Sequence, residues 1–178
     1  KISEVKNMWW EILLAVVLPF IFLIIAINLI SKRIQNNKLE LIKESINELF
    51  PDAEIKNYPY KNFYHLEIVE EEKTTLIKVI FARDDYEFII TNTNLWTINI
   101  DPRQWNRKTR PIFIEDAKEF TEHNKSGENI RKIVCLHPGT KRIIRYLNES
   151  DTVIVKPEDI YKGINFMNYN ELREFLIK

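Results

Sequence analysis

Residues 12–30 read ILLAVVLPFIFLIIAINLI, and only Pro19 and Asn28 interrupt an otherwise aliphatic and aromatic run. As a helix with a rise of about 1.5 Å per residue, this run would be roughly 28 Å long, close to the ~30 Å hydrocarbon core of a bilayer. A helix inside a soluble protein is rarely apolar on every face over such a length. The run therefore predicts a transmembrane helix.

The residues that flank the run predict where the helix ends and which way it points. Trp9 and Trp10 stand where aromatic side chains anchor a helix at the membrane surface. The nearby cations are Lys1 and Lys6 before the run, and Lys32, Arg33, Lys38 and Lys43 after it. Because the more positive flank stays in the cytoplasm, we expect a short extracytoplasmic segment at 1–8, a transmembrane helix at 9–31 and a cytoplasmic domain at 32–178.

A cleaved signal peptide is the alternative interpretation of the same run. Signal peptides have an apolar region of about 7–15 residues, which ends in small residues at a cleavage site. The run in this chain is longer, and the residues 28–33 that end it, NLISKR, make a poor cleavage site. We therefore expect an uncleaved membrane anchor.

The composition of the whole chain excludes several classes of protein. The chain has 26 Lys and Arg against 26 Asp and Glu, so it is neither a wholly basic nucleic-acid arm nor an acidic tail. Its one cysteine, Cys135, excludes an internal disulfide framework and a zinc site built from cysteines. The three histidines, His65, His123 and His137, form no familiar set of metal ligands. We expect no metal and no cofactor.

Hydrophobic periodicity after the membrane run predicts a helix followed by strands. Apolar residues at helical spacing predict a helix over 39–49 that packs on the domain rather than forming a coiled-coil stalk. Runs of β-branched and aromatic residues predict an antiparallel meander with strands at 63–69, 75–82, 86–91 and 95–100. In the second of these strands, alternation separates a face with Ile77, Val79 and Phe81 from a face with Leu76, Lys78 and Ile80.

The carboxyl half of the chain completes the expected fold. The pattern predicts helices at 112–123, 140–147 and 169–177, and strands at 130–136 and 152–155. The strands on either side of the helix at 140–147 would form a βαβ unit. We therefore expect an α+β protein, with one amino-terminal transmembrane helix and then a mixed-sheet domain made of a meander, a βαβ unit and a carboxyl-terminal helix.

This order of elements resembles that of restriction-endonuclease-like nucleases, whose topology would imply metal-dependent cleavage of nucleic acid. Such a site needs an acidic residue and then an acidic residue two positions before a lysine, so that carboxylates hold Mg²⁺ at the scissile phosphate. Glu87 fits the acid, but Ile89 stands where the lysine should be. Asp84 and Asp85 are further metal-ligand candidates in an ordinary turn sequence. A metal-dependent nuclease that uses these three acids, or an inactive relative, is our alternative function.

A second candidate site lies at the predicted strand-to-helix junction CLHPGTK, residues 135–141. Open α/β sheets place ligands at the carboxyl ends of strands, and a helix amino terminus attracts anions. This predicts ligand binding by His137, Thr140, Lys141 and Arg142. In the alternative interpretation, Cys135 is a core residue and Thr140 only caps the helix.

Positive charge gathers in two segments of the domain, and Trp105 stands inside the first of them. The cations are Arg103, Arg107, Lys108 and Arg110 in one segment and Arg131, Lys132, Lys141, Arg142 and Arg145 in the other. An aromatic ring among cations favours stacking on a base or docking on a partner. We expect a contact surface at Trp105, Arg107, Arg110, Lys141 and Arg142.

Together these patterns predict a single-pass membrane protein with a non-catalytic binding or scaffold domain. Its partners would be the lipid bilayer and a protein at the membrane, with anionic lipid or nucleic acid as further candidates for the basic surface. A subunit of a larger membrane complex is a related interpretation, in which the helix itself contributes contacts through Asn28.

Overall fold

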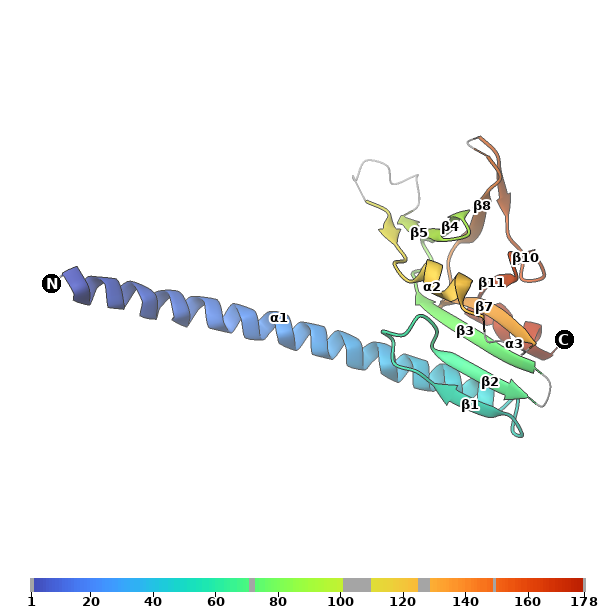
Figure 1. Cartoon of the computed structure of the whole chain (residues 1–178), viewed down its shortest axis with the longest axis horizontal. Helices are drawn as coiled ribbons and strands as arrows, with labels where there is room; N and C mark the ends of the chain where they lie inside the picture. Colours follow the sequence, from blue (N-terminus) through green and yellow to red (C-terminus); the bar gives the residue numbers. More distant parts are fainter. Residues whose placement is uncertain (1, 71–72, 101–109, 125–128, 149, 178) are drawn as a thin grey trace. The chain divides into compact units, whose positions relative to one another are not determined.

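The computed structural model describes residues 2–70, 73–100, 110–124, 129–148 and 150–177, and within these ranges the side chains of 14–99 and of 110 onward. The chain divides into two compact units, residues 1–38 and 39–178. Figure 1 shows the order of the helices and strands. They are α1 (Ile2–Asn47), β1 (Glu54–Asn57), β2 (Leu66–Glu70), β3 (Lys73–Phe81), β4 (Tyr86–Asn92), β5 (Leu95–Ile100), β6 (Ile112–Phe113), α2 (Ala117–Glu122), β7 (Ile130–His137), β8 (Arg142–Tyr146), β9 (Thr152–Ile154), β10 (Ile160–Tyr161), β11 (Ile164–Asn168) and α3 (Tyr169–Ile177).

The amino-terminal helix carries the apolar run. Every residue from Leu14 to Ile30 is exposed, although almost all of these side chains are apolar. Among the described residues, α1 is the one helix long and apolar enough to cross a membrane. A hydrophobic surface that continues all round a helix is stable in lipid rather than in water. The structure thus agrees with the anchor expected from the sequence.

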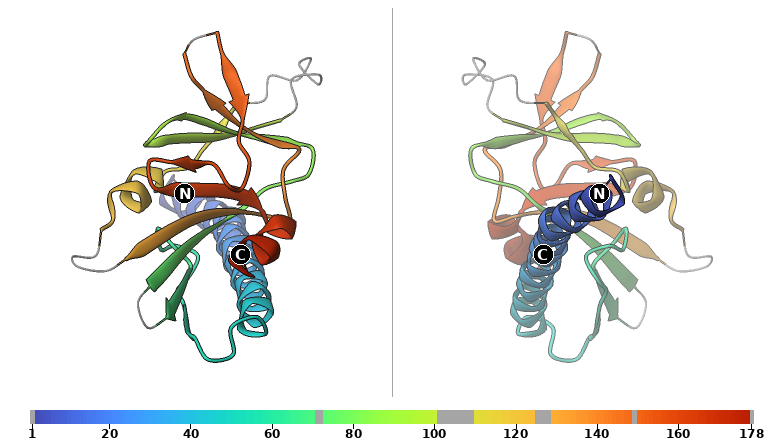
Figure 2. Two further views of the ribbon diagram at one scale, coloured as in Figure 1. Left: turned by 90° about the vertical axis from the view of Figure 1, so that its right-hand side faces the viewer. Right: turned by 90° about the vertical axis from the view of Figure 1, so that its left-hand side faces the viewer.

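The second unit contains two sheets. The first sheet has the strand order β1-β2-β3-β7-β11-β10, and the second has the order β6-β5-β4-β8-β9. Three neighbouring pairs are parallel, namely β3 with β7, β7 with β11, and β4 with β8, and the other pairs are antiparallel. Figure 2 shows the second sheet stacked on one face of the first.

Two hydrophobic clusters cover the two faces of the first sheet. The cluster between the sheets centres on aromatic rings, because Trp96 lies 5.3 Å from Phe166 and 6.3 Å from Phe88 and from Phe120, measured between ring centroids. The cluster on the other face joins the end of α1 to α3. Strands buried on both faces read as continuous apolar runs, which explains the sequence of β3.

Several expectations from the sequence are confirmed. The α+β class holds, with an amino-terminal apolar helix, mixed sheets and a carboxyl-terminal helix. Ile77 and Val79 point into one cluster while Leu76 and Ile80 point into the other, as the alternation predicts. The end of α1 packs on the sheet domain as expected, through the buried side chains of Leu39, Ile42 and Ile46.

The predicted helix at 140–147 is wrong, and so is the βαβ unit built on it. This segment contains strand β8, which pairs in parallel with β4 and aligns Ile143 with Phe88. Strands β7 and β8 lie in different sheets, with Pro138 and Gly139 between them. Pairing with β4 stabilises this segment as a strand, because its β-branched side chains suit a strand.

The predicted helix at 112–123 is too long, and, apart from β6 and β8, three further strands were not expected. Residues Ile112 and Phe113 form β6, which pairs with β5, so the helix α2 covers only Ala117–Glu122. The missed strands are β1, β10 and β11. Because β1 and β10 are short edge strands, neither has a long enough alternating pattern to stand out in the sequence.

Candidate functional site

The expected basic surface is only partly described. Trp105 and Arg107 lie outside the described residues. Arg110 is exposed and stands two residues before β6. The register aligns Ile112 with Ile98 on β5, and on the neighbouring strands it aligns Glu87 with Arg142. Arg110 and Arg142 therefore belong to the same end of the second sheet, three strand spacings or roughly 14 Å apart.

The acids of the nuclease alternative are separately engaged. Glu87 is buried, and its Oε1 accepts hydrogen bonds from Nε of Arg142 at 2.6 Å and from Nη2 at 2.5 Å. Asp85 pairs with Arg83, and Asp84 is exposed. In the described part of the chain, no three His, Cys, Asp or Glu side chains gather as metal ligands would. The Arg142 guanidinium thus neutralises the one buried carboxylate of this alternative.

The junction at 135–141 has a different structure from the one expected. No helix begins there, so the helix amino terminus that would attract an anion is absent. Thr140 instead donates hydrogen bonds from its N–H (2.8 Å) and its hydroxyl (3.2 Å) to Oδ1 of Asn168. The backbone N–H of Lys141 donates to the carbonyl of Tyr86 at 2.8 Å. Ligand binding by these residues stays a prediction.

Two further residues near the junction pack into the protein. Cys135 is fully buried in the cluster that joins α1 and α3, and this burial raises the pKa of its thiol well above the usual value. The thiol therefore stays protonated at neutral pH. The ring of His137 packs against Phe81 and Tyr169, with centroid separations of 5.7 Å and 4.9 Å.

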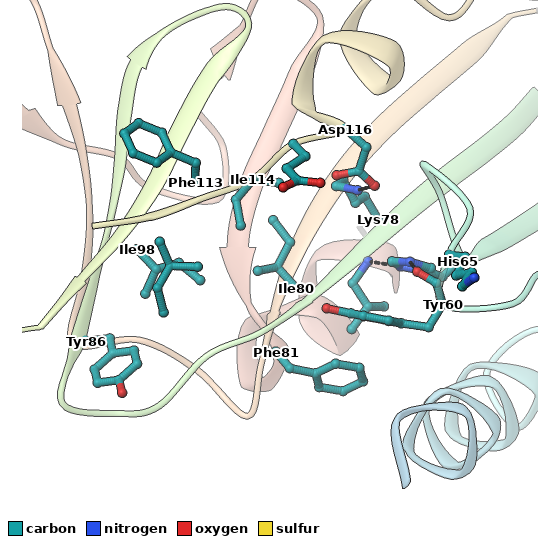
Figure 3. Close-up of a pocket in the computed structure, with 14 residues that line it drawn as sticks. Tyr60, His65, Lys78, Ile80, Phe81, Tyr86, Ile98, Phe113, Ile114 and Asp116 are labelled. Carbon is teal, nitrogen blue, oxygen red and sulfur yellow. Dashed lines mark hydrogen bonds and ion pairs between the residues drawn. The ribbon is translucent and has the colours of Figure 1, made fainter. Parts of the chain in front are cut away.

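The structure reveals a pocket that was not expected from the sequence, and we call it the inter-sheet pocket. It has a volume of about 460 Å³ and lies between β3 of the first sheet and β4, β5 and β6 of the second (Figure 3). Its polar lining comprises Tyr60, Lys61, His65, Lys78, Tyr86, Glu115 and Asp116. Its apolar lining comprises Val79, Ile80, Phe81, Ile98, Ile112, Phe113 and Ile114.

An ion pair forms one end of the inter-sheet pocket. The Lys78 ammonium donates hydrogen bonds to Oδ2 of Asp116 and to the carbonyl of Phe63, the latter at 3.0 Å. Lys78 is only 2% exposed, whereas Asp116 is one-third exposed. Burial lowers the pKa of Lys78, and the charge of Asp116 opposes this shift. The pair also fixes the segment before α2 to the first sheet.

His65 is held as a neutral ring beside this ion pair. The N–H of Val79 donates to Nδ1 at 2.8 Å, so the ring proton lies on Nε2, which donates to the carbonyl of Tyr60 at 3.1 Å. The rings of Tyr60 and His65 stack at 5.2 Å. Burial and the nearby Lys78 charge lower the pKa of His65 to about 4. With both nitrogens bonded to backbone, the ring organises the site rather than exchanging protons at neutral pH.

Acidification is expected to destabilise the sheet domain through His65. Its pKa rises from about 4 when folded to its ordinary value of 6.5 when unfolded, so the unfolded chain binds the proton more tightly. Its contribution is complete above pH 6.5 and is lost as the pH falls to about 4, which amounts to roughly 3 kcal/mol in the free energy of unfolding. Urea unfolding of the full chain across this pH range measures the loss.

The matched variants separate His65 from other acid-sensitive groups. His65→Asn keeps an acceptor near the Val79 N–H but has no titrating ring, so its stability should fall less on acidification than that of the wild type. Ser150→Ala, an exposed substitution that removes no titrating group, is the control and should retain the wild-type pH dependence. If stability depends on pH in the same way in wild type and His65→Asn, the buried His65 ring is not the group that causes the loss of stability in acid.

Comparisons with known proteins give no family for this chain. No protein family, no curated protein and no solved structure matches it. The function is therefore inferred from the residues and their geometry.

Proposed function

We propose that the protein is a single-pass membrane-anchored binding module, with its sheet domain in the cytoplasm. The observation that carries this proposal is the run of exposed apolar side chains on α1, from Leu14 to Ile30. The excess of cations after this run supports the cytoplasmic orientation of 32–178. The anchor would concentrate the domain near other membrane components, which strengthens weak binding.

The arrangement of reactive groups supports binding as the role of the domain. Cys135 is buried and protonated, His65 is held neutral, and Glu87 is neutralised by Arg142. The inter-sheet pocket, by contrast, is open and combines an apolar wall with a polar end. Such a combination is typical of sites that hold a small molecule.

A second surface of the module would meet a larger partner. Arg110, Lys141 and Arg142 are exposed at the second sheet, and Trp105 and Arg107 stand shortly before Arg110 in the sequence. A protein at the membrane is the partner we propose, and anionic lipid headgroups or nucleic acid would compete for the same cations. Arg142 already pairs with Glu87, so its charge would contribute less to such binding than that of an unpaired cation.

Membrane fractionation tests the proposed anchor. The full chain should stay in the membrane pellet after washing with alkaline carbonate, because its apolar run is embedded in lipid rather than attached by charge. A chain that lacks residues 1–31 is the control and should remain in the soluble fraction. Protease added outside unbroken cells should leave 32–178 intact. Release of the full chain by carbonate would overturn the anchor, and digestion of the domain would overturn its orientation.

A further inference from the structure

We infer that the inter-sheet pocket binds a small uncharged organic molecule, with an apolar aromatic or aliphatic body and a hydroxyl or amide head. This inference rests on the proposed binding function and names the class of ligand. Two features carry it: an apolar wall with exposed side chains at its mouth, and an ion pair between the buried Lys78 and the partly exposed Asp116, with one donor and one acceptor left over.

The apolar wall fits the body of such a ligand. Ile80 and Ile98 are almost fully buried at the back of the pocket, while Ile112 and Phe113 at its mouth are 53% and 57% exposed. Large apolar side chains that are exposed beside a concave site gain most from covering by a ligand. The volume of about 460 Å³ falls in the range of about 300–1,000 Å³ that is usual for small-molecule sites.

Aromatic rings form a second side of the pocket. Figure 3 shows Tyr60 and Phe81 below the Lys78–Asp116 pair, on the side away from Phe113. The centroids of Tyr60 and Phe81 are 5.3 Å apart. Because Phe81 lies on the opposite face of β3 from Ile80, these rings flank the pocket at the edge of β3 and leave the isoleucines to contact the body of the ligand.

The polar end of the pocket fits a head that both accepts and donates hydrogen bonds. A lysine ammonium has three donors, and within the described residues Lys78 uses two of them, on Phe63 and Asp116. Asp116 accepts a hydrogen bond from Lys78 through Oδ2. Its side chain makes no capping hydrogen bond to α2, so Oδ1 remains as an acceptor for a ligand. A hydroxyl or a primary amide supplies both complementary groups at once.

The charges around the pocket favour a neutral head. Lys61 and Lys78 balance Glu115 and Asp116, so the lining carries no net charge. A carboxylate head would compete with Asp116 for Lys78, and an ammonium head would compete with Lys78 for Asp116. Either one would leave a charge beside the buried pair without a partner, which costs binding free energy.

Three probes with one body and different heads test this inference. They are 2-phenylethanol, phenylacetate and phenethylammonium, each titrated into the full chain in lipid nanodiscs. Isoleucine methyl NMR spectra report binding, because Ile80, Ile98 and Ile112 line the pocket whereas Ile68 and Ile133 lie in the other cluster. The alcohol should shift the first three signals saturably and leave the other two in place. The charged probes should bind at least about tenfold more weakly.

Two exposed substitutions provide the matched control. Phe113→Asp puts a charge at the mouth of the pocket and should weaken binding of 2-phenylethanol at least about tenfold. Ile154→Asp makes the same kind of change on an equally exposed side chain of β9, outside the pocket, and should leave binding unchanged. The inference is overturned if the alcohol causes no saturable shift, if a charged probe binds as tightly, or if Phe113→Asp has no effect. A carbonate-resistant chain with any of these results would keep its anchor and lose only this ligand.

Discussion

Asp116→Leu should lower the free energy of unfolding by about 3–5 kcal/mol, because it leaves the Lys78 charge buried without its counter-ion. Lys78 is 2% exposed and would keep only the carbonyl of Phe63 as a partner. The substitution removes no capping bond, since the Asp116 side chain makes none to α2. Urea unfolding of the full chain in nanodiscs, followed by pulse proteolysis, measures the change.

The double variant Lys78→Met/Asp116→Leu separates the lost pair from lost packing. It removes both charges, so it should be more stable than Asp116→Leu alone. The pH dependence gives a second check. Burial lowers the pKa of Lys78, and Asp116 raises it, so in Asp116→Leu the unfolded chain binds the proton more tightly and stability should increase as the pH rises toward the ordinary lysine range. A double variant less stable than the single one would contradict this account.

Trp96→Ala should also cost about 3–5 kcal/mol, because it opens a cavity in the cluster that holds the two sheets together. Trp96 is fully buried, and its ring contacts those of Phe88, Phe120 and Phe166. Phe166 belongs to the first sheet, whereas Trp96 belongs to the second. The substitution therefore weakens the attachment of one sheet to the other. Denaturant unfolding gives the magnitude.

The neighbouring residue supplies the control for this cavity. Leu95 stands beside Trp96 on β5 but is 37% exposed, so Leu95→Ala should cost less than about 1 kcal/mol. Trp96→Phe should fall between the two alanine variants. It keeps most of the aromatic packing and removes an indole N–H that has no hydrogen-bond partner among the described residues. Equal losses for Leu95→Ala and Trp96→Ala would show that the indole is not central to the packing.

Local pattern was enough to predict the elements whose neighbours in sequence are also their neighbours in space. Strand β2 pairs with β3, and β4 pairs with β5, so alternation and turn residues suffice for these two hairpins. The predicted single meander of four strands is wrong, because β3 and β4 lie in different sheets. Strand β8 differs, because its partner β4 is far away in sequence and Arg142 pairs with a residue 55 positions earlier. Such distant pairing can override any helical tendency of 140–147.

The inter-sheet pocket was missed for a similar reason. One signal was present, since Lys78 interrupts an apolar strand in which both neighbours are buried. A cation in that position needs a counter-ion, but Asp116 lies 38 residues further along the chain, in a segment whose pattern predicts a helix. Nothing in the local pattern connects the two residues. The exposed basic residues, by contrast, are evident in the sequence, although their contacts are not.

The cluster that joins α1 to α3 has a consequence for synthesis of the protein. Leu39 and Ile42 leave the ribosome more than one hundred residues before Leu172 and Leu176, which complete their apolar environment. Strand β7 likewise waits for β11 on one side. Contacts between distant parts of a chain form slowly, so nascent chains will expose apolar surface to chaperones until β11 and α3 have been made. A stop codon before Leu172 should therefore yield a misfolded, degraded product rather than a slightly shorter domain.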